Sequence, residues 1–307
     1  MNIDQKKSYS IIEKEQFDWS NLARKTFQSC WRKTLIDDKT GIISLLSHRI
    51  IDDLKVVPKH VIKRRLKFLG AASLLFWTAA NLQDDLSDEK TTPKEYIPLA
   101  NICLRRAHLF CYQFSLNHPE TNEQFKNILH AVDEANLREL SLPKIIPNGA
   151  LTPANKSLFL LAGPKLLISA LAWNKADQEN FLNAGKYFLS AKQLADDVYD
   201  YQDDWKKGRR NFAHRNLTKL PNRKELPIYF HKQALRIKAL CLKSRKLLKA
   251  VSALKNGNCF DEYLLPIETN CDRVLANLKL QAQANYNHSK KTQRFAPQVT
   301  TAPARNL

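Results

Sequence analysis

Apolar residues recur at every third or fourth position over long stretches of this chain. The pattern is clearest in residues 66–82, 158–173, 181–201 and 231–254. This spacing places apolar side chains along one face of an α-helix and does not match the two-residue alternation of a half-buried strand. Only 7 glycines and 13 prolines occur in 307 residues, so few positions favour a break in the backbone. We therefore predict an all-α fold, a helical bundle built as a single domain over residues 1–288.

Prolines, glycines and polar runs divide this bundle into expected helices. Residues 1–57 predict two or three short helices. Longer helices are expected over about 58–88, 95–116, 120–141, 155–173, 176–205, 228–255 and 260–285. Within the fourth of these, Gly163-Pro164 predicts a kink or a split. Hydrophobic periodicity ends near Ser289, so residues 289–307 are predicted to form a disordered tail.

The cysteines and histidines exclude several classes of protein. The six cysteines form no C-x-x-C pair and no cluster with histidine, which argues against a disulfide framework or a zinc site. The eight histidines form no HExxH motif, and the chain has no P-loop. The polar N-terminus lacks the apolar core of a signal peptide, and the most apolar stretches are interrupted or closed by charges. These features favour a cytoplasmic protein, with membrane association as a further option.

Positive charge is concentrated in the last third of the chain. The net charge is +19, and from Trp205 onward 22 Lys/Arg face 5 Asp/Glu, a difference of +17. Residues 231–255 have the pattern of a basic amphipathic helix. An ordinary bundle helix with a lysine-rich exposed face is the favoured interpretation, and peripheral contact with an anionic membrane is the alternative. We expect no specific nucleic-acid partner.

Two aspartate motifs carry the strongest functional signal. Of five Asp-Asp pairs, only two have a third aspartate four residues after the first, namely Asp84-Asp85-Leu86-Ser87-Asp88 and Asp196-Asp197-Val198-Tyr199-Asp200. Residues i and i+4 share a helix face, so the outer carboxylates of each motif repel one another. The first motif also ends its apolar run, where the helix dipole disfavours acids. Magnesium offsets such repulsion, because it binds carboxylate oxygens and bridges them to substrate phosphates.

The segments QDDLSDE (83–89) and QLADDVYDYQDDWKKG (193–208) resemble the two aspartate-rich motifs of trans-isoprenyl diphosphate synthases, in the class I terpenoid synthase superfamily. The resemblance covers roughly residues 60–210. It implies a class I isoprenoid synthase-like helical bundle, a homodimer, that uses Mg²⁺ to ionise an allylic prenyl diphosphate and extends it with isopentenyl diphosphate. The metal ligands it implies are Asp84, Asp85, Asp88, Asp196, Asp197 and Asp200. Lys156 and Gln193 match residues that contact the diphosphate.

Two groups of neighbouring residues extend this predicted site. Lys206, Lys207, Arg209 and Arg210 follow the second motif, and they either close over the diphosphate or form an exposed basic loop. Ala79 and Ala80 lie about one turn before Asp84. In the resembled family, bulky residues at these positions stop the growing chain. Small ones leave a pocket open toward Phe76 and Trp77, unless the alanines serve only close helix packing.

Departures from the family pattern leave alternatives open. The GGKRxRP segment of the family is absent, and Lys63-Arg64-Arg65 is the nearest equivalent. A site for isopentenyl diphosphate is therefore in doubt, and a terpene synthase acting on one prenyl diphosphate is the alternative. The second motif favours elongation, because terpene cyclases usually have an Asn/Ser/Glu triad there. An alternative of another class is a non-catalytic basic helical protein that binds membrane, nucleic acid or a synthase partner subunit.

Overall fold

The computed structural model of the protein describes residues 2–16, 19–56, 58, 60–88, 92–116, 152–208, 211–214 and 217–294, with positions 123, 126, 127, 129, 130, 133 and 134. The side chains of 15, 87, 88, 152, 153, 155, 156, 279 and 281–294 lie outside this description. Within the described ranges the chain contains helices and no strand, apart from a single bridge between Leu54 and Leu254. The predicted all-α fold is confirmed.

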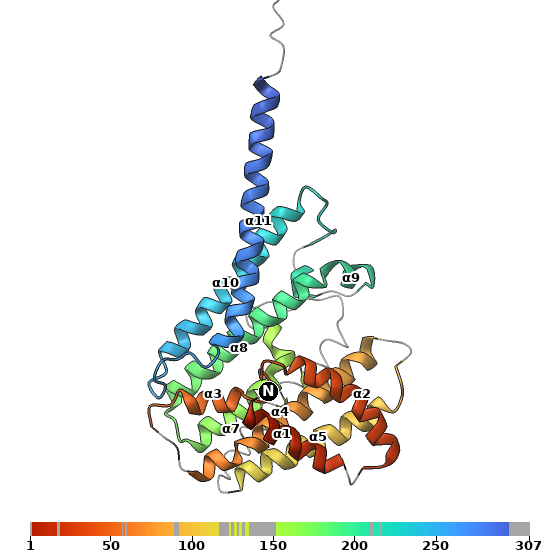
Figure 1. The fold of residues 1–307 in the computed structure, drawn as a ribbon, viewed down its shortest axis with the longest axis vertical. Helices are drawn as coiled ribbons and strands as arrows, with labels where there is room; N and C mark the ends of the chain where they lie inside the picture. The colour runs from red at the N-terminus through yellow and green to blue at the C-terminus, as the bar shows by residue number, and fades with distance from the viewer. Residues whose placement is uncertain are drawn as a thin grey trace, which may run out of the picture.

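The helices follow one another along the chain as Figure 1 shows. The first half contains α1 (Ile3–Glu15), α2 (Asn21–Asp37), α3 (Leu46–Asp52), α4 (His60–Asp88) and α5 (Tyr96–Ser115). The second half contains η2 (Thr152–Leu161), α7 (Ala162–Ala170), α8 (Lys175–Tyr199), α9 (Tyr201–Lys206), η3 (Phe212–His214), α10 (Leu226–Lys249) and α11 (Asp261–Arg294). None of these described helices combines the length and apolar character needed to cross a bilayer.

Two long helices organise the packing. α4 packs along α5 and against α1, whereas α8 packs along α10 and against η2. Close approach of α1 to α4 depends on Gly70, where a Cβ atom would lie 2.4 Å from the Ser8 Oγ and 2.7 Å from the Ser44 carbonyl oxygen. The core between the helices is rich in fully buried aromatic rings, among them Phe110, Phe181 and Phe188. Burying these large side chains supplies much of the free energy of folding.

The observed helix ends differ from the predicted ones in three places. The predicted helix 176–205 is interrupted at Asp200, which separates α8 from α9. The split predicted at Gly163-Pro164 is present slightly earlier, between η2 and α7, and both residues lie in the first turn of α7, where a proline is tolerated. α11 continues to Arg294, into the predicted tail, because extending a helix needs no apolar stripe once it is nucleated. Most of the predicted helix 120–141 and residues 295–307 lie outside the described residues.

Three buried aspartates hold the loops that connect the helices. Asp38 ends α2 and accepts hydrogen bonds from the backbone N–H groups of Ile43 and Ser44. Asp53 follows α3 and accepts from two backbone N–H groups of the loop between α10 and α11. Asp177, in the first turn of α8, accepts from Ser252 in the same loop. Each carboxylate therefore satisfies donors that a buried loop would otherwise leave unpaired.

Candidate functional site

The helices that carry the two aspartate motifs run in parallel. On α8, a Cβ atom at Gly185 would lie 2.7 Å from the Leu161 Cδ2 atom of η2. Gly163 of α7 follows Leu161 by two residues. A Cβ atom there would lie 3.4 Å from the Ser73 Oγ and 3.5 Å from the Leu69 Cβ of α4. η2 and α7 thus connect the middle of α8 with the middle of α4. Further along both helices, Lys192 of α8 and Trp77 of α4 are in direct contact.

The parallel course brings both motifs to the same level of the bundle. Lys192 lies two turns beyond Gly185, and Trp77 lies one to two turns beyond the α4 residues that contact Gly163. Asp84 comes two turns after Trp77, and Asp196 comes one turn after Lys192. In Figure 1 both helices rise toward the end of the body at which α9 lies. The carboxyl ends of α4 and α8 therefore form one acidic end of the bundle.

Helix periodicity determines which aspartate of the first motif is directed at α8. Asp84 lies seven residues after Trp77, close to two full turns, so it projects from the face that meets Lys192. Asp84 is exposed, and the helix reaches Asp88, whose side chain is outside the described part. Asp85 points elsewhere, because its carboxylate lies 3.5 Å from the Nζ of Lys33 on α2. Asp85 is thus directed toward α2 and not toward α8.

Lys192 supplies a positive charge between the two motif helices. Its Nζ lies 2.8 Å from the Asp196 Oδ2 and 5.6 Å from the ring centroid of Trp77. An ammonium over an indole ring is attracted by the negative face of the π-system, so both contacts favour a cation at this point. The same indole donates its Nε1–H to Asp37 at 2.7 Å. The contacts thus run from Asp196 on α8 through Lys192 to the Trp77 ring on α4, and from there to Asp37 at the end of α2.

Asp196, Asp200 and Asp204 form an acidic ladder along α8 and α9. The Asp200 amide donates to the Asp196 carbonyl oxygen, and the Asp204 amide donates to the Asp200 carbonyl oxygen, so the i, i+4 spacing survives the break between the helices. Partial burial and then the negative charges of Asp204, Asp196 and Asp203 raise the pKa of Asp200. Asp196 and Asp200 therefore keep the one-turn spacing of the motif, and Asp204 continues it. Their mutual repulsion is the kind of charge that a bound cation relieves.

Asp197, the second aspartate of its motif, faces inward. It is 6 % exposed, and its carboxylate accepts the Gln193 Nε2 at 2.7 Å and the backbone N–H of Phe212 at 2.7 Å. The Asn211 amide connects this segment to the ladder by donating to the Asp197 carbonyl and to the Asp204 carboxylate. In this arrangement Asp197 and Gln193 hold the segment that follows α9. Their predicted roles at the metal and the diphosphate remain predictions.

The segment after α9 is held by a buried histidine. Asn211 donates its backbone N–H to the Nδ1 of His214 at 3.2 Å. Since Nδ1 accepts, the proton of the neutral ring lies on Nε2, which donates to the carbonyl oxygen of Tyr201. The Trp205 ring packs edge-on against the imidazole at 5.2 Å. These contacts attach η3 to α9 and to the start of that helix at Tyr201.

The predicted diphosphate ligands are only partly described. Lys206 and Lys207 are exposed, and the Lys206 Nζ lies 3.7 Å from Asp203. Gly208 has φ of 73°, a left-handed backbone conformation that favours glycine, and no other atom lies within 4 Å of the position of a Cβ atom there. The remaining ligands fall outside the description: Arg209, Arg210 and the side chain of Lys156.

The four residues predicted to line a chain-length pocket lie on two sides of α4. Trp77 packs against Phe159 of η2 at 5.9 Å, on the side of α4 that meets α8. Ala80 is half-buried and follows Trp77 by about one turn, so it belongs to the same side. Phe76 instead packs against His108 of α5 at 5.9 Å, and Ala79 is fully buried. Phe76 is therefore directed toward α5, away from the aspartates.

The sequence analysis missed two members of this site. Asp37 belongs to an Asp-Asp pair that lacks the third aspartate, so no motif marked it. Its proximity to Trp77 and to Asn81, whose amide donates at 3.3 Å, arises only when α2 packs on α4. Lys192 lies outside both motifs, but its spacing from Asp196 carries a signal. A lysine four residues before an aspartate on a helix predicts an i, i+4 ion pair.

Among the described side chains, no three acidic, histidine or cysteine groups converge to form a complete metal cage. Magnesium, however, usually takes only one or two protein carboxylates and completes its octahedron with water and substrate phosphates. The exposed carboxylates of Asp84 and Asp196 fit that requirement, and the ammonium of Lys192 marks a point where positive charge is held. No family model matches the chain, and no curated protein does.

Proposed function

We propose that the protein is a magnesium-dependent prenyltransferase that ionises an allylic prenyl diphosphate and joins it to isopentenyl diphosphate. The observation that carries this proposal is the parallel course of α4 and α8, with Trp77 and Lys192 in contact and both aspartate motifs at one level. Carboxylates on two facing helices suit a substrate with several negatively charged oxygens that shares metal ions with them.

Asp84, Asp88 and Asp196 would hold Mg²⁺, and Asp200 would add its charge from the next turn of the ladder. The metal would neutralise the departing diphosphate and so favour cleavage of the allylic carbon–oxygen bond. Lys192 lies close enough to exchange its contact with Asp196 for one with a diphosphate oxygen. Lys206 and Lys207 lie on the turn beyond the ladder, where they can approach the same group.

Trp77 and Phe159 give this end of the bundle an apolar wall beside the acidic residues. Their rings lie 5.9 Å apart, and the Trp77 ring already has a cation 5.6 Å from its centroid. An aromatic face that attracts an ammonium also stabilises positive charge on an allylic carbon, without acting as a nucleophile. Ala80, on the same side of α4, has a small side chain and would let a hydrocarbon chain approach Trp77. These features support a prenyl group as the substrate's apolar part.

The proposal is tested by incubating the full chain with C10, C15 and C20 allylic diphosphates, with and without isopentenyl diphosphate. We expect Mg²⁺-dependent release of diphosphate, together with formation of a longer prenyl diphosphate, only when isopentenyl diphosphate is present. Asp84→Ala and Asp196→Ala should each lower the rate by roughly 10³-fold, as expected for loss of groups that stabilise the departing charge. Asp52→Ala removes an exposed carboxylate on α3 and should leave the rate unchanged.

Two results would contradict the proposal. Turnover of one prenyl diphosphate without isopentenyl diphosphate would identify a terpene synthase instead. No magnesium-dependent turnover of any of these substrates, from a chain with the helical content of the structure, would remove the enzymatic interpretation.

A further inference from the structure

The outward face of α10 carries an apolar stripe that the bundle does not cover. Ile228, Leu235 and Leu242 are 61 %, 49 % and 67 % exposed. They are spaced seven residues apart, close to two helical turns, so they lie on one line along the helix. α10 packs against α8 and α11 on its other sides. In the described structure this line of large apolar side chains therefore faces solvent.

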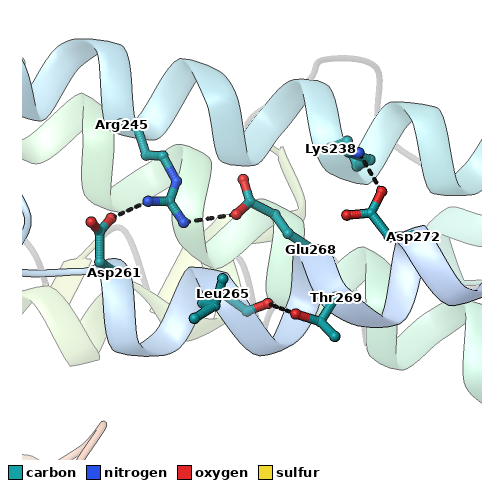
Figure 2. A network of polar contacts seen from close by, with 7 residues as sticks. All are labelled: Lys238, Arg245, Asp261, Leu265, Glu268, Thr269 and Asp272. Atoms are coloured by element: carbon teal, nitrogen blue, oxygen red, sulfur yellow. Dashed lines mark hydrogen bonds and ion pairs between the residues drawn. The ribbon is translucent and has the colours of Figure 1, made fainter.

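The flank of α10 next to this stripe contains a charged seam with α11. Figure 2 shows Lys238 paired with Asp272, and Arg245 paired with both Asp261 and Glu268. The Arg245 Nη2 lies 2.7 Å from the Glu268 Oε2. These pairs bring the acidic residues of α11 to the seam.

The seam leaves the outward face with positive charge alone. After Glu225 the chain has four acidic residues, of which three are in the seam and the fourth, Glu262, pairs with Arg49. α10 itself contains no acidic residue. Lys232, Lys246 and Lys249 are exposed on the side of α10 that carries the stripe, and no ion pair is recorded for them in the described structure. The positive charges beside the stripe are thus not neutralised by the acids of the seam.

We propose that this face of α10, the Ile228–Leu235–Leu242 stripe with its flanking lysines, docks the protein on an anionic lipid surface. An apolar line bordered by lysines suits the boundary between headgroups and acyl chains, where the apolar side chains are buried and the ammonium groups meet lipid phosphates. The inference is independent of the proposed enzymatic activity.

Two other occupants of this face fit the observations less well. A second copy packed symmetrically would place the same lysine-rich face against itself, and like charges at such an interface are destabilising. A nucleic acid would use the lysines but would leave the apolar stripe without a role, since its affinity comes mainly from phosphate contacts. An anionic membrane accounts for both the apolar line and the charge.

Sedimentation with vesicles tests the proposal. The full chain should co-sediment with vesicles of mixed phosphatidylcholine and phosphatidylserine, weakly with phosphatidylcholine alone, and less at high salt. Lys232→Gln with Lys246→Gln and Lys249→Gln should weaken binding by at least tenfold, because each lysine near an anionic surface changes affinity by about fivefold. Leu235→Ser with Leu242→Ser should also weaken it by at least tenfold, since both side chains lose apolar burial.

Matched variants separate this face from the overall charge of the protein. Lys6→Gln with Lys25→Gln and Lys55→Gln removes the same charge from exposed positions in the first part of the chain. Leu22→Ser with Ile36→Ser removes two exposed apolar side chains from α2. These controls should bind vesicles to within about twofold of the unchanged chain, apart from the small effect of net charge.

Three results would overturn the proposal. The first is vesicle binding that is absent, or that the α10 variants and the controls reduce equally. The second is a dimer in analytical ultracentrifugation that Leu235→Ser with Leu242→Ser dissociates, which would identify a second copy as the occupant. The third is binding to a polyanion such as heparin that is tighter than vesicle binding and unchanged by the two serine substitutions.

Discussion

Asp38 and Asp196 are the same residue type in opposite surroundings. Asp38 is fully buried and accepts hydrogen bonds from two backbone N–H groups, from the hydroxyl groups of Tyr9 and Ser44, and from the Gln5 amide. Asp196 is exposed and, among the described side chains, forms an ion pair with Lys192, while Asp200 and Asp204 follow on its own face. The protein surrounds Asp38 with hydrogen-bond donors, whereas it places other carboxylates next to Asp196.

This difference indicates how a carboxylate's role follows from its neighbours. Where N–H and O–H donors converge on a buried carboxylate, as at Asp38 or Asp177, the group fixes a loop, and its charge is satisfied by the fold itself. Where carboxylates converge on one another at an exposed helix end, the fold leaves negative charge that a cation from solution can satisfy. Substitutions in the first group should reduce stability, and those in the second should reduce function.

The largest effect on stability is expected for Asp38→Ala. It leaves several buried donors without an acceptor, so the free energy of unfolding should fall by about 3 kcal/mol or more. Asp196→Ala should change it by less than about 0.5 kcal/mol, because an exposed i, i+4 ion pair contributes little. Urea unfolding monitored by circular dichroism measures both. If Asp38→Ala does not fold, Asp38→Asn provides the milder comparison. Equal destabilisation by Asp38→Asn and Asp196→Ala would remove the distinction.

Asp197→Ala tests the comparison inside a single motif. Asp197 belongs to the structural group although it is the neighbour of Asp196, because it accepts from Gln193 and from the Phe212 backbone. Its loss should lower the free energy of unfolding by about 2 kcal/mol, from two buried donors left unpaired. Unfolding experiments should place Asp197→Ala between Asp38→Ala and Asp196→Ala. A loss no larger than that of Asp196→Ala would show that Asp197 is not a structural residue.

Magnesium should stabilise the chain through the exposed group alone. At ten times its dissociation constant, a bound ion raises the free energy of unfolding by about 1.4 kcal/mol. For a chain of this size this corresponds to a rise in Tm of roughly 2 °C. Thermal unfolding in MgCl₂, against NaCl of equal ionic strength, measures the shift. The double variant Asp84→Asn with Asp196→Asn should lose the shift, and its persistence there would place the ion elsewhere.

Much of the fold was predictable because the signals are local. The apolar periodicity of residues 66–82 and the turns that flank them predicted a helix over 58–88, and α4 spans His60–Asp88. The break at Asp200 had no such signal, since the residues around it are compatible with a continuous helix. It is associated with contacts from distant residues, in which Asn211 meets Asp197 and Asp204, and His214 meets the carbonyl oxygen of Tyr201. The apolar periodicity of one helix cannot predict contacts with residues outside that helix.

The candidate site was predictable in part for the same reason. Spacing alone indicated that Asp196 and Asp200 share a helix face, because the i, i+4 relation is a property of one helix. The inward direction of Asp197 also had a signal, since it continues the buried line of Ser190 and Leu194 at helical spacing. The contact of Lys192 with Trp77, and that of Trp77 with Asp37, joins separate helices. Such pairings depend on packing that a single sequence does not reveal.

The smallest expected effect is a pair of opposite pH dependences. Burial raises the pKa of Asp177, but hydrogen bonds from Ser252, Ala253 and Asn174 outweigh it, so the pKa of Asp177 lies below its ordinary value. The stabilisation by Asp177 is therefore present above the ordinary pKa of an aspartate and is lost as the pH falls below it. Asp200 has the opposite sign, because partial burial and the neighbouring carboxylates raise its pKa. Its contribution is favourable at low pH and is lost as the pH rises through the raised pKa.

In urea unfolding without Mg²⁺, Asp200→Asn should therefore be more stable than the unchanged chain at about pH 7. The two should be equally stable at about pH 3, where Asp200 is protonated in both the folded and the unfolded state. Asp177→Asn should be less stable at about pH 7, and the difference should shrink toward about pH 3. Differences of the same sign in the two variants at neutral pH would contradict the division between the two groups of aspartates.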